Sequence, residues 1–286
     1  MPIYRPSELH QFLNELGVHP KKGLSQNFLI DGNIIRKIVA SASIDSEDLV
    51  LEIGPGPGCL SEEILNTGAH LMAVEKDPVM AKALERLKGP NKKLEVFCED
   101  ILEFPIEQSL SQRLKPGKKA VILGNLPYHL TTPILTKLVN LHPYVSRIVI
   151  MVQEEVARRF TAQAGTSDYS SFTVFLNYYT FPKYGFMVRK SCFYPIPKVD
   201  SGVVVLDLHQ PPVVTNEQAF FELTRTAFGQ RRKMMRASLK ELYPSQAITE
   251  GLIKIGLPEE ARPEQLTLEN FIHLFDYLQM LKAQLG

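Results

Sequence analysis

The feature that most constrains this chain is an alternation of short apolar runs and helical stretches that begins at residue 49. Between these runs, helical spacing of apolar residues recurs at 60–65, 79–87 and 134–141. Strands and helices in repetition predict an α/β domain, with a parallel sheet covered on both faces. Buried parallel strands are nearly continuous in apolar residues, as are Leu49–Ile53, Leu71–Val74, Leu94–Phe97, Ala120–Leu123 and Ile148–Val152.

The rest of the chain divides at a proline pair. Runs at 172–181 and 203–208 are rich in β-forming residues, and the proline-rich segment between them predicts no regular structure. Pro211-Pro212 marks a linker, beyond which apolar residues recur with helical spacing. We therefore expect a domain over 1–209, with an N-terminal extension at 1–30, and a small all-helical domain over 210–286.

Composition excludes several classes of protein. The 286 residues are 44% hydrophobic and 22% charged, as in soluble globular proteins. Thirty-two Lys and Arg balance 31 Asp and Glu, so a nucleic-acid surface must be a local patch. The three cysteines and seven histidines show no metal-ligand or disulfide spacing, and we predict no metal. Without a signal peptide or a bilayer-length apolar run, we expect a cytoplasmic protein with no membrane segment.

Glycines and two acidic residues follow three successive predicted strands. The first strand runs into a turn with glycines at 54, 56 and 58, which exposes backbone amides to a ligand. Glu75 ends the second strand, 21 residues after Gly54, where dinucleotide-binding folds place an acid on a ribose. Asp100 follows the third. The glycine spacing is not G-x-G-x-x-G, so a ribonucleoside with an amino-acid tail fits better than a dinucleotide, and a dehydrogenase is the weaker alternative.

The fourth strand ends in Asn125-Leu126-Pro127-Tyr128. This motif resembles the N/D-P-P-Y/F signature of S-adenosylmethionine-dependent methyltransferases that modify exocyclic amines. Such an amine is a poor nucleophile because its lone pair is delocalised into the ring. Two acceptors for its N–H groups, the Asn125 side-chain oxygen and the Leu126 carbonyl, favour a pyramidal nitrogen that faces a methyl donor. Tyr128 offers a face on which an extruded base can stack.

With this motif, nearly the whole chain resembles the small-subunit (16S) ribosomal RNA adenine N6,N6-dimethyltransferases (KsgA type). The resemblance implies a Rossmann-like methyltransferase sheet with a C-terminal helical domain. It also implies transfer of methyl groups to N6 of two adjacent adenines near the 3′ end of small-subunit rRNA during ribosome biogenesis. The segments that carry it are Gln26–Leu29, Glu52–Gly56, Glu75, Asp100, Asn125–Tyr128, Phe193–Ser201 and the helical tail.

The resemblance further assigns a cofactor and roles to residues. The cofactor is S-adenosylmethionine, which leaves as S-adenosylhomocysteine, and no metal is implied. Glu75 lies on its ribose and Asp100 beside its adenine amine, while Phe193 and Tyr128 sandwich the target base. The implied cofactor-binding residues are Asn27, Leu29, Gly54, Gly56, Glu75, Asp100 and Asn125, and the implied catalytic residues are Asn125, Leu126, Tyr128 and Phe193.

Positive charge is concentrated late in the chain. Between residues 183 and 240 there are ten Lys and Arg against four Asp and Glu. The densest piece is 231–236, near the start of a predicted helix. It predicts contacts to RNA phosphates, and the alternative is a solvated basic face. The resemblance implies that this RNA is small-subunit rRNA within a pre-30S assembly intermediate. The predicted RNA-binding residues are Lys198, Arg231, Arg232, Lys233 and Arg236.

Other functions stay open at this point. One is a methyltransferase for large-subunit rRNA or for adenines in DNA, against which the run 195–201 and the long tail argue. Another is an RNA-binding assembly factor in which catalysis is incidental. We expect the protein to be a monomer.

Overall fold

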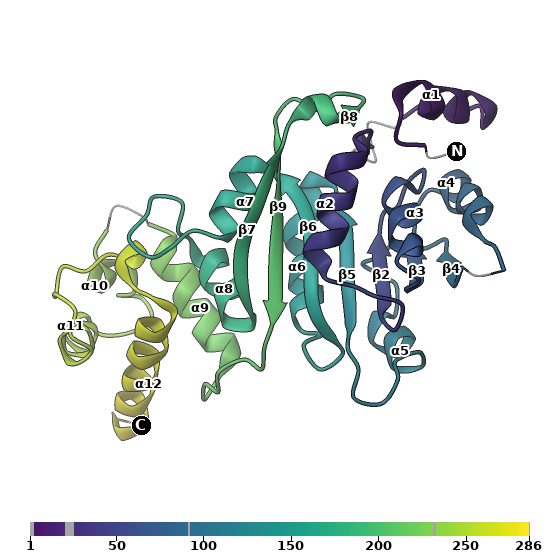
Figure 1. Ribbon diagram of the computed structural model, residues 1–286. Coiled ribbons are helices and arrows are strands. Elements are labelled where there is room, and N and C mark those ends of the chain that lie inside the picture. The colour runs from purple at the N-terminus through teal and green to yellow at the C-terminus, as the bar shows by residue number, and fades with distance from the viewer. Residues whose placement is uncertain (1–2, 21–25, 91, 231–232, 286) are drawn as a thin grey trace. The chain divides into compact units, whose positions relative to one another are not determined.

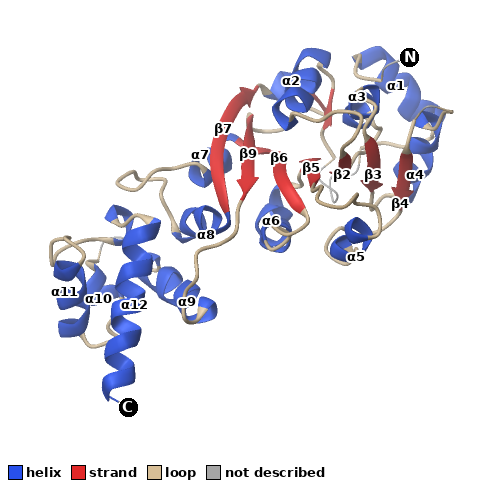
Figure 2. Ribbon diagram, turned by 60° about the horizontal axis from the view of Figure 1, so that its bottom comes forward, coloured by secondary structure: helices blue, strands red, loops and turns tan. Residues whose placement is uncertain are grey.

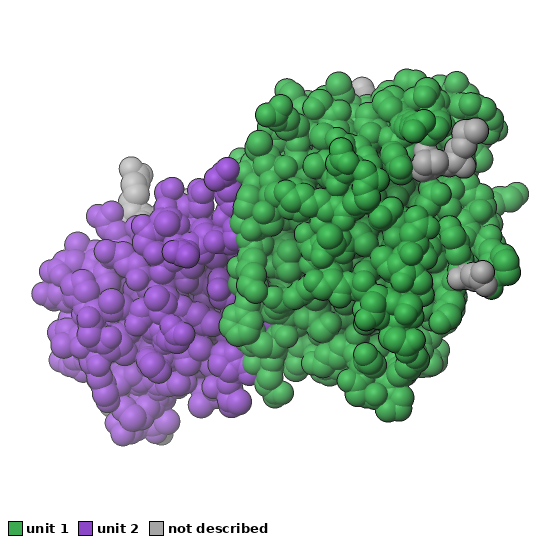
Figure 3. All heavy atoms as spheres, in the orientation of Figure 1, with its two compact units in different colours: residues 1–157, 181–210 green, residues 158–180, 211–286 purple. Residues whose placement is uncertain are grey.

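The computed structural model describes residues 3–20, 26–90, 92–230 and 233–285 (Figure 1). The chain forms two compact units, coloured separately in Figure 3. One contains residues 1–157 and 181–210, and the other contains 158–180 and 211–286. Residues 158–180, which the expected domain of 1–209 includes, therefore belong to the same compact unit as the tail.

The first unit is built on a mixed sheet in which the described residues form seven strands, in the order β4-β3-β2-β5-β6-β9-β7. The strands from β4 to β6 run parallel to their neighbours, and β9 is antiparallel to β6. A separate antiparallel pair joins β1 (Phe28–Leu29) to β8 (Phe193–Tyr194). The main strands are β2 (Leu49–Ile53), β3 (His70–Val74), β4 (Leu94–Phe97), β5 (Ala120–Asn125), β6 (Val145–Gln153), β7 (Thr180–Val188) and β9 (Ser201–Leu208).

Helices cover both faces of this sheet, as the sequence predicts. Helices α2 (Gly32–Ala42) and α3 (Cys59–Asn66) lie on one face, and α5 (Ile106–Ser111) and α6 (Thr131–Val139) on the other (Figure 2). Asp31 caps α2 by accepting hydrogen bonds from the backbone N–H groups of Asn33 and Ile34. The unit also contains α1 (Pro6–Glu15), α4 (Pro78–Ala83) and the 3₁₀ turns η2 (Leu84–Leu87), η3 (Tyr128–Leu130) and η4 (Lys190–Cys192).

The second unit is helical. Its largest buried side chains are aromatic, and the Phe220 and Phe275 rings meet with centroids 5.6 Å apart. Helix α7 (Glu154–Phe160) crosses the boundary between the units. The remaining helices are α8 (Ser171–Tyr179), α9 (Glu217–Phe228), α10 (Met235–Ser238), α11 (Ser245–Lys254) and α12 (Leu268–Leu285), with the 3₁₀ turn η5 (Pro263–Gln265). In the part of the chain that the structure describes, no helix combines the length and the apolar character that a bilayer crossing requires.

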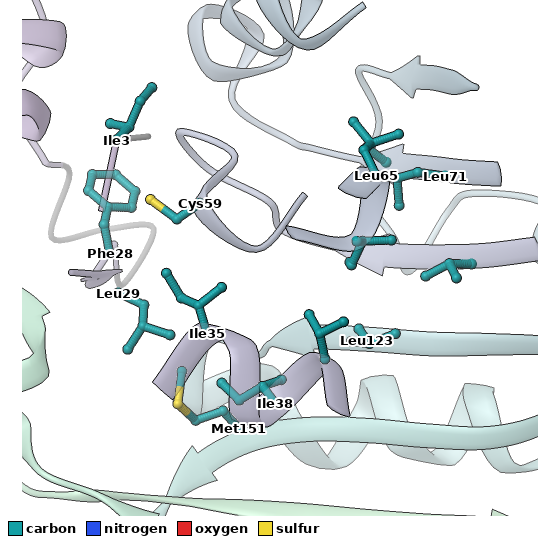
Figure 4. Packing of buried hydrophobic residues seen from close by; sticks show 14 of the residues in the cluster. Ile3, Phe28, Leu29, Ile35, Ile38, Cys59, Leu65, Leu71, Leu123 and Met151 are labelled. Carbon is teal, nitrogen blue, oxygen red and sulfur yellow. The ribbon is translucent and has the colours of Figure 1, made fainter. Parts of the chain in front are cut away.

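The N-terminal segment packs into the core of the first unit. Phe28 and Leu29 are each 7% exposed and lie in one buried cluster with Ile35 of α2, Cys59 of α3 and Met151 of β6 (Figure 4). Burial of apolar side chains contributes about 25 cal/mol per Å² removed from water. This packing fixes residues 26–30 against the ends of the central strands.

The expectation of a β-rich run at 172–181 is wrong, because residues 171–179 form helix α8. Its rings recur at helical spacing, so that Phe172 contacts Phe175 and Phe175 contacts Tyr179. Ser170 and Thr173 form a capping box at its start. Helical periodicity and the cap therefore prevail over the β propensity of aromatic residues.

The expectation of irregular structure between 182 and 200 is also wrong in part. Strand β7 runs through Pro182, which an edge strand tolerates because one side of its backbone makes no ladder hydrogen bonds. The five strands predicted between 49 and 152 do pair parallel, and β9 adds an antiparallel strand next to β6. The predicted strand at 203–208 is confirmed as part of β9. Its apolar sequence does not indicate whether it runs parallel or antiparallel to its neighbour.

One carboxyl group is buried within the sheet. Glu52 of β2 is 1% exposed and accepts a hydrogen bond from the Ser61 hydroxyl of α3. Burial disfavours the charged form and raises the pKa of Glu52 to about 8, and the hydrogen bond from Ser61 only partly offsets this. The native protein therefore keeps a proton on Glu52 at neutral pH.

This burial predicts a pH dependence of stability for Glu52→Gln. From the ordinary pKa of 4.5 up to about 8, the unfolded carboxyl is ionised while the native one is protonated. Wild-type stability should therefore fall relative to the variant as pH rises through this window, by up to about 1.4 kcal/mol per pH unit. Urea unfolding at several pH values measures it, with the exposed Glu85→Gln as the control. Parallel pH curves for wild type and Glu52→Gln would contradict the burial argument.

Candidate functional site

A cavity of about 180 Å³ lies at the carboxyl ends of β2, β3, β4 and β5. Parallel strands place their carboxyl ends at one edge of the sheet, so residues far apart in the sequence meet there. Segment 26–28 and helix α6 also contribute to the wall. Of the predicted site residues, the wall contains Asn27, Gly54, Gly56, Glu75, Asp100 and Asn125. Leu29 lies instead on a smaller cavity of about 50 Å³ that shares Asn27, Gly54 and Asn125.

The glycine turn presents bare backbone to this cavity. Gly54 has φ +64°, and no atom lies within 4 Å of the place where a β-carbon would be. Gly56 has φ +56°, and a β-carbon there would lie 2.9 Å from the Phe28 ring. Glycine is therefore required at 56 both for the backbone conformation and for the close approach of the N-terminal segment. At 54 it leaves open space on the cavity side.

Glu75 follows β3 and is 6% exposed. Its two carboxylate oxygens accept hydrogen bonds from the backbone N–H groups of Gly56 and Asp77, each at 2.8 Å. Burial raises the pKa of Glu75, although these amide bonds act in the opposite direction. The carboxyl is thus held rigidly against the glycine turn, with its remaining lone pairs as acceptors for hydroxyl donors.

Asp100 follows β4 and lies between a cation and a backbone turn. Lys76 Nζ is 2.7 Å from Asp100 Oδ2, and the Leu102 N–H donates to Oδ1 at 2.9 Å. The hydrogen bond from Lys76 is the main reason that the pKa of Asp100 lies below its usual range. Asp100 is therefore ionised at neutral pH and is an acceptor at the cavity wall.

Asn125 ends β5, and its side chain has a defined orientation. Asn125 Nδ2 donates to the backbone carbonyl of Asn27 at 3.0 Å. Only the NH₂ side of an amide can donate to a carbonyl, so Oδ1 points away from Asn27. The N-terminal segment thereby orients this amide so that its oxygen, on the side away from Asn27, is available as an acceptor.

Leu126 and Tyr128 also belong to the Asn125 motif and have predicted catalytic roles. Neither residue lines the cavity in this structure. Leu126 is 1% exposed, and its N–H donates to the Met151 carbonyl at 3.2 Å. Tyr128 is half-buried, and its hydroxyl lies 3.2 Å from the Ser201 hydroxyl. Ser201 is fully buried at the start of β9, so it gives the Tyr128 hydroxyl a fixed partner.

Phe193 does not belong to the described lining of either cavity. It lies on β8, opposite Leu29 of β1, and is 1% exposed. Its ring is therefore part of the buried apolar cluster in this structure. The sandwich of a base between Phe193 and Tyr128 stays a prediction, and it requires this ring to be uncovered.

The predicted RNA-binding residues are only partly within the described chain. Lys198 is exposed in the loop before β9, and Lys233 is exposed before α10. Arg236 of α10 forms an ion pair with Glu259 at 3.1 Å. Arg231 and Arg232 lie outside the described residues.

Sequence patterns assigned no role to three supporting residues. These are Lys76 at Asp100, Ser201 at Tyr128 and Lys137, whose Nζ donates to three backbone carbonyls of the loop after Asp100. Their partners lie 24 to 73 positions away in the chain, beyond the reach of periodicity. Among the described residues, no group of three His, Cys, Asp or Glu side chains is placed to hold a metal ion.

Known sequences match this chain along almost its whole length. Residues 18–280 match the family described as ribosomal RNA adenine dimethylase. The chain is 59% identical over 278 residues to ribosomal RNA small subunit methyltransferase A of Protochlamydia amoebophila (strain UWE25). The aligned region covers 97% of this chain and 98% of that protein. The enzyme of the same name from Chlamydia felis (strain Fe/C-56) is 44% identical, with coverages of 96% and 95%.

Solved structures agree. A dimethyladenosine transferase from Plasmodium falciparum superimposes with a TM-score of 0.75 and 26% identity, over 90% of this chain and 98% of that one. The 23S rRNA methyltransferase ErmE superimposes with a TM-score of 0.68 and 26% identity, over 88% of this chain and 100% of that one. The methyltransferase fold expected from the sequence is thereby confirmed. The chain belongs to the ribosomal RNA adenine dimethylase family.

Proposed function

We propose that this protein transfers methyl groups from S-adenosylmethionine to N6 of two adjacent adenines near the 3′ end of small-subunit (16S) rRNA. Each adenine receives two methyl groups, which gives N6,N6-dimethyladenine during ribosome biogenesis. The observation that carries the proposal is the placement of Asn125 beside Gly54, Glu75 and Asp100 on one cavity, in a chain of this family.

The residues of the cavity fit the proposed cofactor. The open space at Gly54 accommodates its amino-acid part, and the held carboxyl of Glu75 matches the two hydroxyls of a ribose. The ionised Asp100 is an acceptor suited to the amino group of an adenine. S-adenosylmethionine, when bound, supplies a methyl group on a positively charged sulfur. Asn27 and Leu29 belong to the N-terminal segment and would cover the cofactor from that side.

We assign the orientation of the target amine to Asn125 and Leu126. The Asn125 oxygen, turned away from Asn27, and the Leu126 carbonyl would accept the two N–H groups of the adenine N6. This withdraws the lone pair from conjugation and directs it toward the methyl donor. Positioning of this kind supplies most of the acceleration, and no strong base is needed because the amine becomes acidic only after transfer.

The target base would stack on Tyr128, whose hydroxyl is held by Ser201. Base-modifying enzymes pay unstacking energy of a few kcal/mol to extrude a nucleotide, and an aromatic face recovers part of it. Phe193 is assigned to the opposite face, and it can act there only when its ring, 1% exposed in this structure, is uncovered.

We propose a pre-30S assembly intermediate as the form in which the rRNA is recognised. The basic residues Lys198, Lys233 and Arg236 and the neighbouring Arg231 and Arg232 would contact phosphates. We propose that the protein acts as a cytoplasmic monomer, since the substrate is itself cytoplasmic and one cavity of one chain carries the proposed site.

A methylation assay on assembling small-subunit particles tests the function. We expect dimethyladenosine in small-subunit rRNA, detected by mass spectrometry, and none in large-subunit rRNA or DNA. Asn125→Ala should lower the single-turnover rate by about a hundredfold or more while cofactor affinity changes far less, because its oxygen acts on the attacking amine. The exposed Asn140→Ala is the matched control. An Asn125→Ala rate within about threefold of wild type would remove Asn125 from the reaction.

Cofactor affinity tests the assignment of Glu75. Glu75→Ala loses charge-assisted hydrogen bonds worth about 1.5–3 kcal/mol, so Kd for S-adenosylmethionine should rise about tenfold to a hundredfold. Calorimetry measures it, and the exposed Glu85→Ala should bind as wild type does. Unchanged affinity in a folded Glu75→Ala protein would place the ribose elsewhere.

The salt dependence of particle binding tests the basic run. Replacing Arg231, Arg232, Lys233 and Arg236 by Gln should flatten the log–log slope by up to about 0.9 for each lost phosphate contact, without changing cofactor affinity. A control that neutralises the exposed Lys88, Lys93, Lys115 and Lys118 removes the same charge from the other unit. A lower melting temperature with an unchanged slope would assign the run to a solvated, structural face.

A further inference from the structure

Lys137 occupies an unusual position on helix α6. Its Nζ donates to the backbone carbonyls of Ile101 at 3.0 Å, Leu102 at 2.8 Å and Phe104 at 2.8 Å. A lysine ammonium has three N–H donors, so these carbonyls use all of them. Three carbonyl dipoles that converge on one point repel each other unless a cation lies between them. The ammonium therefore holds this loop in its present conformation.

The loop that Lys137 holds is the one that carries Asp100. The N–H groups of Glu103 and Phe104 donate to the Asp100 carbonyl at 2.9 and 2.8 Å, and that of Leu102 donates to the Asp100 side chain. The turn thus directs amides toward Asp100 and carbonyls toward Lys137. If the carbonyl side of the turn relaxes, the amide side cannot keep its geometry.

Helix α6 also contributes to the cavity wall. Ile134 lies three residues before Lys137, on the same side of the helix, and lines the cavity together with Asp100 and Ile101. The helix begins directly after the Asn125 motif, through the 3₁₀ turn at 128–130. Lys137 therefore ties the loop of Asp100 to the element that follows the methylation motif.

The charge of Lys137 is partly withdrawn from water. This desolvation lowers its pKa, and the nearby Asp100 acts in the opposite direction. The positive charge in turn contributes to the lowered pKa of Asp100, after the larger effect of Lys76. A neutral residue at 137 would thus alter both the shape of the loop and the acceptor strength of Asp100.

We propose that Lys137 is a positioning residue of the methyl-transfer site, which holds Asp100 and Ile101 against the purine of the cofactor and thereby sets its preference for a 6-amino group. The inference rests on the proposed role of Asp100 in binding adenine. Lys137 touches no cofactor atom itself, and it acts through the loop.

The test compares two ligands, S-adenosylhomocysteine and its analogue with hydrogen in place of the 6-amino group. Their ratio of dissociation constants measures what Asp100 contributes to recognition of the amine. In wild type we expect the amino compound to bind about ten to a hundred times more tightly, as one charge-assisted hydrogen bond allows. In Asp100→Ala the ratio should fall to about one, since no acceptor remains.

Lys137→Met should behave as Asp100→Ala does. We expect about tenfold weaker binding of S-adenosylhomocysteine and a ratio below about three. The methylation rate at saturating S-adenosylmethionine should stay within about threefold of wild type, so the change appears in KM rather than kcat. Lys119→Met is the matched control, because exposed Lys119 donates to a single carbonyl, that of His142.

A melting curve first checks that Lys137→Met folds. If it does not fold, Lys137→Arg is the variant to test. Its charge is kept, but a planar fork cannot aim N–H groups at three converging carbonyls, so the ratio should lie between wild type and Asp100→Ala. A folded Lys137 variant with the wild-type ratio overturns the inference, even if its melting temperature is lower. If Asp100→Ala itself keeps the wild-type ratio, the proposed adenine site fails, and the inference fails with it.

Discussion

The parallel pairing of β2, β3, β4 and β5 is the constraint on which the rest of the site depends. It brings Gly54, Glu75, Asp100 and Asn125 to one edge of the sheet, although they span 72 positions of the chain. The strands contribute position, and the turns after them contribute chemistry. Gly54 offers open backbone, Glu75 and Asp100 offer carboxylates, and Asn125 offers an amide. Any change that shifts the register of one strand would separate these groups by about 3.3 Å per residue.

The N-terminal segment adds a second constraint, which connects the proposed cofactor site to the proposed base site. The Asn27 carbonyl orients the Asn125 amide, and the next two residues pair with Phe193 and Tyr194. The Phe28 ring lies against Gly56 at the same time. The proposed covering of the cofactor by this segment and the orientation of the Asn125 oxygen therefore depend on one packed structure. Uncovering of Phe193 for a base would have to take its ring out of the same apolar cluster.

Sequence reasoning was strongest where the pattern is local. The alternation from residue 49 and the residues that end each strand predicted the sheet edge and five of the residues that line its cavity, and the family resemblance added Asn27. It failed at 171–179, where aromatic residues with β propensity form a helix because their spacing is helical and Ser170 caps it. It assigned no role to Lys137 or Ser201, since their partners are distant in sequence and nothing local distinguishes a lysine that holds a loop from one on a solvated face. The burial of Phe193 is likewise a tertiary result, because its ring joins an apolar cluster built from distant parts of the chain.

The central claim is that one cavity holds the cofactor with its reacting end at Asn125, whose oxygen is turned away from Asn27 to accept from the target amine. A crystal structure of the protein with S-adenosylhomocysteine tests it most directly. We expect the ribose hydroxyls on Glu75, the 6-amino group on Asp100 and the sulfur toward Asn125, with the bond from Asn125 Nδ2 to the Asn27 carbonyl intact. A ligand bound away from this sheet edge, or an Asn125 amide turned with its oxygen toward Asn27, would contradict the account.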